Sequence, residues 1–253
     1  MDSSLNKSFS PHVRQVCLSR QDKLRLIAQG ARDILPLILA AIPFGILYGV
    51  LAKAGGLSLG LTMGMSLLVF AGSAQFIAVS MIATGVAWPA ILLTTFFVNL
   101  RHMLYAATLV PHVRQMSGWM KAKIAFWLTD ESFAVVSDWL RRNKGKPGLQ
   151  WYYLGSGLLM YGNWQLCTFL GFSLGEALPG MEGWGLEVAM IVAFVGIVAP
   201  ALTSAPVWIT AAVAVLGGVL TWGWPHQSGL MISSLVAVAA GVLAERLAER
   251  RKV

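Results

Sequence analysis

Three polar residues, Asn99, Arg101 and His102, interrupt one of the most apolar parts of the sequence. Residues 54–100 carry no formal charge, and apolar residues resume after His102. A lone charge at the centre of a bilayer costs about 2.5–3.5 kcal/mol on insertion scales, so an arginine at that depth needs a partner. Arg101 therefore binds an acidic group or a ligand inside the protein, or it reaches lipid headgroups from a helix that ends beside it. The apolar run before it, residues 88–100, is too short to span a membrane upright, which favours the internal position.

The direction of the neighbouring side chains depends on whether the helix is continuous. Asn99 and Arg101 are two residues apart, so on one unbroken helix they point in quite different directions, whereas Arg101 and Tyr105 share a face. Asn99 and Arg101 act on one ligand only if the helix bends or breaks between them.

The natural partners of Arg101 are Asp130 and Glu131 in the stretch LTDES, because residues 34–129 contain no other acid. A carboxyl group withdrawn from water binds a proton more readily, which suits proton coupling, and it also suits recognition of a substrate ammonium group. The alternative is a surface helix with a solvated acidic face, since Asp138 follows closely and three acids are many for one span.

The stretch FAGSAQF, residues 70–76, has a second kind of candidate chemistry. If the helix breaks there, freed backbone groups together with Gly72, Ser73 and Gln75 could bind the carboxylate or ammonium group of a small solute. The alternative is close helix packing, in which small residues let backbones approach and Gln75 forms a hydrogen bond across the interface. Asn163, in MYGNWQL, has the same two interpretations.

The composition shows what kind of chain must position these residues. It is 57% hydrophobic with a mean hydropathy of +0.68, and only 12% of residues are charged, about half the share of a soluble domain. This predicts an all-α polytopic membrane protein with seven or eight transmembrane helices, some of them broken or re-entrant. The apolar windows are 34–52, 57–84, 88–110, 124–140, 151–174, 186–205, 207–222 and 230–243. Segment 124–140 either crosses the membrane or is re-entrant.

The basic residues predict orientation and domain organisation. The net charge is +8, and Lys and Arg cluster before the first apolar window, at 141–146 and at the C-terminus, which predicts these parts to be cytoplasmic. The segment 114–123 is also basic, yet simple counting of spans puts it outside. We expect a cytoplasmic tail (1–33), one transmembrane permease domain (34–244) and a second cytoplasmic tail (245–253).

Other function classes lack the residues they need. The basic clusters have no interleaved aromatic or base-reading residues, so no nucleic-acid partner is expected. Ser156 is a candidate nucleophile, but His226 is the one histidine in the second half of the sequence and lies in a Trp-Pro turn. Metal and phosphate-loop motifs are missing, and Cys17 and Cys167 have no metal or disulfide spacing. The sequence predicts no catalytic residue, no metal and no cofactor.

A faint internal repeat accompanies these features. FGILYGVLAKAGG, residues 44–56, resembles LGFSLGEALPG, residues 170–180, and Phe70–Gly72 is matched 124 residues later by Phe194–Gly196. Many secondary transporters consist of repeats with helices broken near the middle of the bilayer. Chance recurrence in a glycine-rich apolar sequence is the other explanation.

Four ordered stretches, PFGILYGVLA, FAGSAQF, FFVNLRHMLYA and LTDESFAV, make the chain resemble the AzlC family of branched-chain amino acid exporters. The resemblance is clearest over residues 34–146 and continues more weakly, best at YGNW, toward the C-terminus. It implies an inner-membrane permease that exports leucine, isoleucine, valine and sometimes methionine together with a small four-span AzlD-type subunit. The resemblance assigns no substrate-binding residues.

Residue chemistry and resemblance combine into one hypothesis, because an aliphatic amino acid has a carboxylate, an ammonium group and an apolar side chain. We expect proton-motive export of such amino acids, with the alternative of a non-transporting membrane scaffold or assembly subunit. A homo-oligomer is compatible with either. The expected substrate-binding residues are Gly72, Ser73, Gln75, Asn99, Arg101 and Asn163, and the expected proton-coupling or ammonium-binding residues are Asp130 and Glu131.

Overall fold

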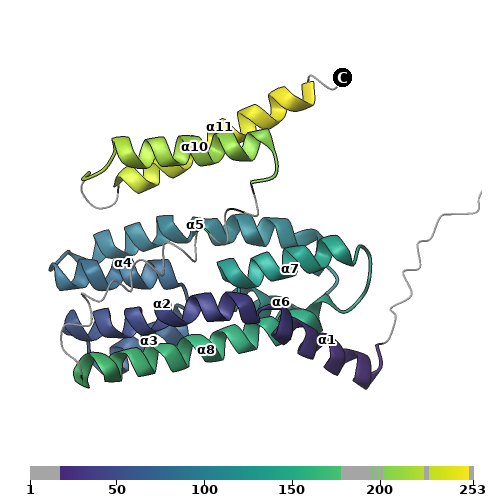
Figure 1. The fold of residues 1–253 in the computed structure, drawn as a ribbon, viewed down its shortest axis with the longest axis horizontal. Coiled ribbons are helices and arrows are strands. Elements are labelled where there is room, and N and C mark those ends of the chain that lie inside the picture. Colours follow the sequence, from purple (N-terminus) through teal and green to yellow (C-terminus); the bar gives the residue numbers. More distant parts are fainter. Residues whose placement is uncertain (1–17, 178–194, 196–198, 200–201, 225–227, 251–253) are drawn as a thin grey trace, which may run out of the picture.

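The computed structural model describes residues 18–177, 195, 199, 202–224 and 228–250, and this part of the chain contains helices and no strand (Figure 1). The all-α membrane class is confirmed. Among the described residues, two helices, α2 and α5, are long and apolar enough to cross a membrane, and α3, α4 and α10 are shorter apolar helices. The helices are α1 (Arg20–Asp33), α2 (Leu35–Ala54), α3 (Leu59–Leu68), α4 (Gly72–Ala83), α5 (Trp88–Val113), α6 (Gly118–Phe126), α7 (Asp130–Arg142), α8 (Leu149–Ala177), α10 (Ala205–Leu220) and α11 (Ser228–Arg250).

Helix α8 packs along both α1 and α2, and glycines make this close approach possible (Figure 1). A Cβ atom added to Gly30, Gly49, Gly155 or Gly171 would overlap the backbone of the helix opposite. In a membrane the lipid is as apolar as the side chains, so tight packing between small residues replaces the hydrophobic drive for helix association. We call these contacts of α1 and α2 with α8 the glycine seam. Residues 20–33, expected as part of the N-terminal tail, thus form a helix packed on the membrane domain.

The two similar segments of the predicted repeat lie against each other in the glycine seam. Gly45 and Gly49 of α2 contact α8 around Cys167 and Thr168, and Gly171 contacts α2 at Ile46. Glycine at this spacing on both helices is therefore explained by one interface. Of the second matched pair, the segment Phe194–Gly196 lies outside the described residues except for Val195.

The second apolar window is broken at Phe70, as the sequence suggested. Phe70 has a φ of 45°, a left-handed conformation that bulky residues rarely adopt. Helix α3 begins with a cap from the Ser58 side chain to the Leu61 amide, whereas α4 begins at Gly72 without a side-chain cap. Figure 1 shows that α3 runs from the end of α2 toward the middle of the molecule and that α4 returns to the same end. The pair is re-entrant, and we call it hairpin A.

Segment 124–140, for which the sequence allowed either a crossing or a re-entrant course, breaks at Trp127–Thr129 between α6 and α7. The break is stabilised by a capping box: Thr129 Oγ1 accepts from the Ser132 amide, and Ser132 Oγ accepts from the Thr129 amide at 2.8 Å. Helix α6 runs inward from the end of α5, and α7 returns to that end to reach α8 (Figure 1). This second re-entrant pair, hairpin B, enters from the end opposite to hairpin A.

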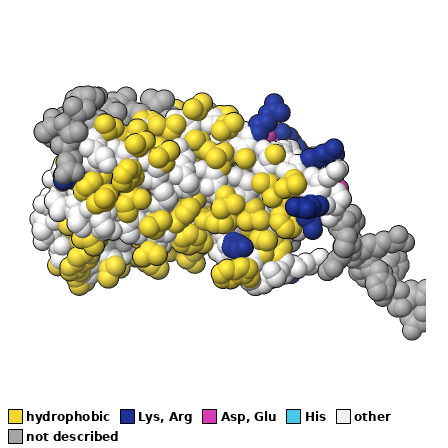
Figure 2. All heavy atoms as spheres, turned by 90° about the horizontal axis from the view of Figure 1, so that it is seen from below, with side chains coloured by type: hydrophobic (Ala, Val, Ile, Leu, Met, Phe, Trp, Pro, Cys, Tyr) yellow, Lys and Arg dark blue, Asp and Glu magenta, His cyan; other side chains and the backbone are white. Residues whose placement is uncertain are grey.

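The two hairpins resolve the conflict in the charge pattern. Because hairpin A does not cross, α5 brings the basic segment 114–123 to the same end as the 141–146 loop and α1 (Figure 1). Figure 2 shows hydrophobic side chains over most of one face and Lys and Arg side chains gathered mainly at one end. We call this the basic end. Helices α10 and α11 form an antiparallel pair that packs at Gly217 and Gly241, and α11 also finishes at this end (Figure 1).

Substitution of Gly171 by Ala is expected to destabilise the protein. The new Cβ atom would overlap the Ile46 carbonyl, and overpacking of this kind costs about 1–3 kcal/mol. The measurement is thermal unfolding of the detergent-solubilised protein. Gly162→Ala, on the same helix with nothing within 4 Å of its Cβ position, is the matched control and should leave the unfolding temperature unchanged or raise it. Equal unfolding temperatures for both variants would disprove the seam as a constraint.

The hairpins also predict which positions are accessible from the same side. In a cysteine-free background, Ala54→Cys and Ala87→Cys should react with an impermeant thiol reagent from one side of the membrane. Gln115→Cys and Lys144→Cys should react from the other, because all four positions are exposed at or beyond helix ends. If Ala54→Cys and Ala87→Cys are labelled from opposite sides, hairpin A is not re-entrant.

Candidate functional site

The tips of the two hairpins meet halfway along the molecule and enclose a small pocket. Hairpin A contributes residues 70–73 and hairpin B contributes residues 129–131, while α2, α5 and α8 supply the remaining walls. Each of these three long helices reaches the pocket near its own midpoint, at Phe44, Arg101 and Trp164. A helix break at membrane depth is tolerated only where protein or water satisfies the freed backbone groups, so both breaks belong at such a place.

Arg101 links both hairpins to α5. Its Nη1 atom lies 2.9 Å from Asp130 Oδ2, and its Nη2 atom donates to Ser73 Oγ at 3.2 Å. The Tyr105 hydroxyl donates to Asp130 Oδ1 at 2.6 Å, so both carboxylate oxygens are used. Side-chain exposure is 25% for Arg101 and 12% for Asp130, which makes this an internal ion pair. The sequence-based expectation that Arg101 pairs with an acid inside the protein is confirmed.

The acids sit at the start of α7, in its first turn. The unpaired amides of a helix N-terminus favour negative charge there, which helps to hold two neighbouring carboxyl groups in a partly buried place. Among the described residues that line the pocket, two carboxyl groups face one guanidinium. Asp130 is paired with Arg101, and Glu131 forms no ion pair with a described residue. The pocket therefore has one acid more than its arginine neutralises.

Hairpin A brings a second helix N-terminus to the same pocket. Helix α4 begins at Gly72, has no side-chain cap, and lines the pocket with Gly72 and Ser73. Its first amides have no partner within the helix, and with Arg101 beside them they form a region that attracts an anion. A carboxylate is the anionic group that suits such a region in a small organic solute.

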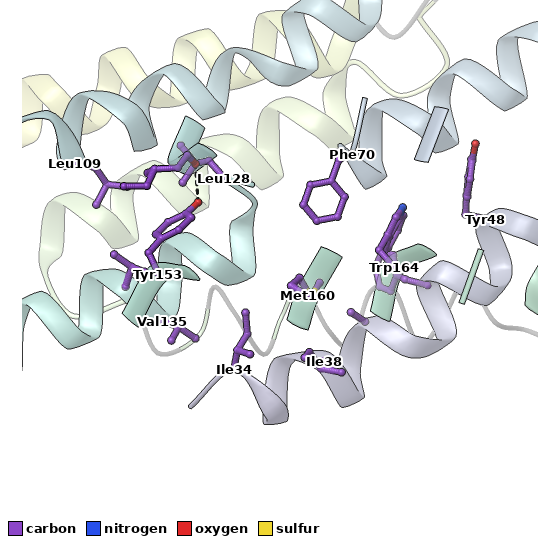
Figure 3. Close-up of a cluster of buried hydrophobic side chains, with 14 of the residues drawn as sticks. Ile34, Ile38, Tyr48, Phe70, Leu109, Leu128, Val135, Tyr153, Met160 and Trp164 are labelled. Carbon is purple, nitrogen blue, oxygen red and sulfur yellow. Dashed lines mark hydrogen bonds between the residues drawn. The ribbon is translucent and has the colours of Figure 1, made fainter. Parts of the chain in front are cut away.

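Much of the rest of the pocket wall is apolar. Phe44, Phe70, Met160 and Trp164 line it, and Figure 3 shows that Phe70, Met160 and Trp164 lie around one common space. Phe70 also packs edge-on against Tyr161, with ring centroids 4.9 Å apart. A cluster of charges together with hydrocarbon is what an amphipathic solute needs.

The cavity itself has a volume of about 40 Å³. Benzene fits a cavity of about 150 Å³, so this space suits water molecules, and a larger solute enters only after the walls move apart. Within the described residues, no group of three His, Cys, Asp or Glu side chains is placed to hold a metal ion.

Of the eight residues expected at a substrate site, five come together here: Gly72, Ser73, Arg101, Asp130 and Glu131.

The other three expected residues lie away from the pocket wall. Gln75 is fully buried, donates to Ser66 Oγ and accepts from the Trp164 indole. Asn163 accepts from Cys167 Sγ at 3.6 Å, and its amide nitrogen is buried without a hydrogen-bond partner. Asn99 lies on the unbroken helix α5 with a buried, unpartnered side-chain oxygen, and it points away from Arg101 as a continuous helix requires.

Sequence reasoning did not select several residues of the wall. His102 was noted beside Arg101, but Phe44, Thr129, Met160 and Trp164 were not singled out as site residues. The apolar ones carry no distinguishing pattern in a sequence that is mostly apolar. Thr129 had a detectable signal, because a threonine followed three residues later by a polar residue is a helix-start pattern.

The ion pair predicts a coupled response to mutation. Arg101→Gln or Asp130→Asn alone should lower stability by about 3 kcal/mol, because each leaves one charge without its partner. The double variant Arg101→Gln/Asp130→Asn should be more stable than either single variant. Thermal unfolding of the four proteins in detergent measures the coupling, and strictly additive losses would show that the two groups do not interact.

A protein-family model described as "AzlC protein" matches residues 36–178, which include every residue of the pocket. The chain is 30% identical over 178 residues to the inner membrane protein YgaZ of Escherichia coli (strain K12), covering 69% of each chain. It is 31% identical over 156 residues to an uncharacterized membrane protein of Archaeoglobus fulgidus, covering 62% of this chain and 66% of that one. Over 101 residues it is 30% identical to the branched-chain amino acid transport protein AzlC of Bacillus subtilis (strain 168), covering 40% of this chain and 39% of that one. No solved structure matches the chain.

Proposed function

Because the chain belongs to the AzlC family, we propose that it is a secondary transporter that exports branched-chain amino acids across the cytoplasmic membrane. The proposed substrates are leucine, isoleucine and valine, with methionine as a further one, and the proton motive force drives the export.

The observation that carries the proposal is the position of the pocket between two re-entrant hairpins that enter from opposite ends. Secondary transporters bind substrate near the middle of the bilayer, where broken helices present backbone groups and half-helix ends. When each hairpin closes the pocket toward one end, movement of one hairpin opens it to one side only. This is the requirement for alternating access.

An amino acid matches the groups around the pocket. In our proposal its carboxylate binds Arg101, Ser73 and the first amides of α4, because Arg101 donates to Ser73 and both line the pocket beside the start of α4. Its ammonium group binds Glu131 and Asp130. Its aliphatic side chain packs on the apolar wall, which has no polar group to satisfy.

The surplus acid provides a means of coupling. Glu131 has no cationic partner among the described pocket residues, so it is most stable either protonated or beside a substrate ammonium group. A group that alternates between these two states exchanges one proton for one substrate. Protons that enter from outside then drive amino acids outward.

We further propose that the basic end faces the cytoplasm, because Lys and Arg flank the cytoplasmic ends of spans. Closure at this end rests on contacts around Asp33, which accepts from the Tyr152 hydroxyl at 2.8 Å and lies 3.7 Å from Arg142 Nη2. Arg142 is the last residue of α7, so these contacts hold hairpin B against α1 and α8. They are partly exposed and weak enough to break during transport.

A small four-span subunit of the AzlD type is the proposed partner. Helix α5 exposes large apolar side chains along its length, including Leu92, Phe96, Met103 and Leu104, and offers a face for such a subunit within the bilayer. A non-transporting scaffold is the alternative, and it differs in predicting no response to amino acids.

The test is leucine transport in inside-out vesicles from cells that produce this protein with an AzlD-type subunit. The wild-type protein should exchange labelled leucine and accumulate it when a proton gradient is imposed. Glu131→Gln should keep exchange but lose gradient-driven accumulation. The charge-neutral pair Arg101→Gln/Asp130→Asn should fold and yet exchange leucine at least about tenfold more slowly, which corresponds to ~1.4 kcal/mol of binding.

Gly162→Ala, at an exposed position of α8 that does not line the pocket, is the control and should transport normally. Wild-type rates in the double variant would refute the site. An absence of leucine exchange by the wild-type protein, with no leucine-dependent change in thermal unfolding, would favour the scaffold.

A further inference from the structure

Trp164 is the most constrained residue of the apolar wall. Its side chain is buried, its indole N–H donates to Gln75 Oε1 at 3.1 Å, and its ring stacks on Tyr48 with centroids 6.3 Å apart. The far edge of the ring touches Gly72, where an added Cβ atom would lie 2.9 Å from Cη2. Trp164 therefore packs tightly between α8 and the first residue of α4, and an added methyl group at Gly72 would not fit unless the ring shifts.

A buried chain of hydrogen bonds fixes this ring. Gln75 Nε2 donates to Ser66 Oγ at 3.0 Å, and Ser66 Oγ lies 2.9 Å from Thr168 Oγ1, one turn after Trp164 on α8. Gln75, Ser66 and Thr168 are all fully buried. The chain begins and ends on α8 and passes through both arms of hairpin A. Rotation of the indole would leave a buried amide oxygen without a donor, which is costly in a low-dielectric interior.

Two other residues of the apolar wall, Phe70 and Met160, have less fixed positions. Phe70 lies at the tip of hairpin A, which must move for substrate to enter, and Met160 has a flexible unbranched side chain that adapts to what it contacts. Trp164 belongs to α8, which the glycine seam holds against α1 and α2. Of these three residues, Trp164 is the one that combines a rigid helix with a side chain locked by a hydrogen bond.

We infer that Trp164 sets the largest side chain that the pocket admits, and that Gln75 acts as a positioning residue for it. The inference rests on the proposed function, since it concerns the side-chain specificity of the same pocket. It gives Gln75 a role that differs from the direct substrate contact expected from the sequence. The admitted solutes are amino acids with short or branched aliphatic side chains, and aromatic side chains are excluded by contact with the indole.

The experiment compares leucine with phenylalanine in the same vesicles, as the ratio of their kcat/KM values. Trp164→Phe enlarges the apolar half of the pocket and should raise the phenylalanine-to-leucine ratio roughly tenfold, the size of effect typical for small changes of volume in an apolar pocket. Gly72→Ala adds a methyl group against the indole ring of Trp164. It should shift the preference toward smaller substrates, measured as a higher valine-to-leucine ratio.

Gln75 is tested by two variants, one without and one with an acceptor for the indole N–H of Trp164. Gln75→Met removes the acceptor for the indole N–H and should relax the exclusion of phenylalanine, as Trp164→Phe does. Gln75→Glu keeps an acceptor at the same place and should retain the wild-type ratio. A purely structural role for Gln75 would lower leucine and phenylalanine transport in parallel and leave the ratio unchanged.

The outcomes separate this inference from the function on which it rests. If the wild-type protein and the variants transport leucine but the ratios stay within twofold of wild type, the inference is wrong and the proposed function stands. If the wild-type protein transports neither amino acid, both fail. If Trp164→Phe does not fold, two other variants still test the inference. Gly72→Ala should raise the valine-to-leucine ratio, and Gln75→Met should raise the phenylalanine-to-leucine ratio.

Discussion

The ion pair between Arg101 and Asp130 is the interaction on which the arrangement of this protein depends. Arg101 lies halfway along a 26-residue apolar helix, and a guanidinium in such a place is most stable with partners supplied by the protein. Those partners are Asp130 at the start of α7 and Ser73 at the start of α4. Because both partners of Arg101 stand at helix breaks, the two breaks lie beside the same side chain. The helix N-termini at these breaks have free amides, which suit the carboxylate of the proposed substrate.

The molecule divides into helices that pack at glycines and two hairpins, which are the parts that move in the proposed transport cycle. Helices α1, α2 and α8 are packed backbone to backbone at glycines, where no side chain lies between them to adjust. The hairpins instead contact their surroundings through aromatic rings and a few hydrogen bonds, such as the stacking of Tyr105 on Phe133 at 4.4 Å. Rigid and mobile elements meet at the pocket, where Trp164 belongs to the first kind and Phe70 to the second. This division is what a transporter needs, because one wall must keep the specificity while another opens.

Several features were predictable because the sequence left few alternatives. An internal position of Arg101 favoured an acidic partner, and residues 34–129 contain no acid, so Asp130 and Glu131 were the candidates. The break at FAGSAQF was predictable because a continuous window was too long for one helix. Gln75 shows the limit of such reasoning: an amide in an apolar stretch signals a hydrogen bond, but its type and position do not say whether the partner is a substrate or a tryptophan 89 residues away.

The sequence by itself determined the class of the protein and the clustering of basic residues, because hydropathy and charge are summed locally along the chain. It also determined the likeness of the two glycine-rich segments, although not that they face each other. Only the tertiary structure decided that both broken segments are re-entrant, since crossing and returning helices have the same composition and differ only in where the chain goes after the break. The same holds for the pocket: its apolar wall consists of ordinary hydrophobic residues, and their contacts with residues far away in the sequence, not their type, bring them together.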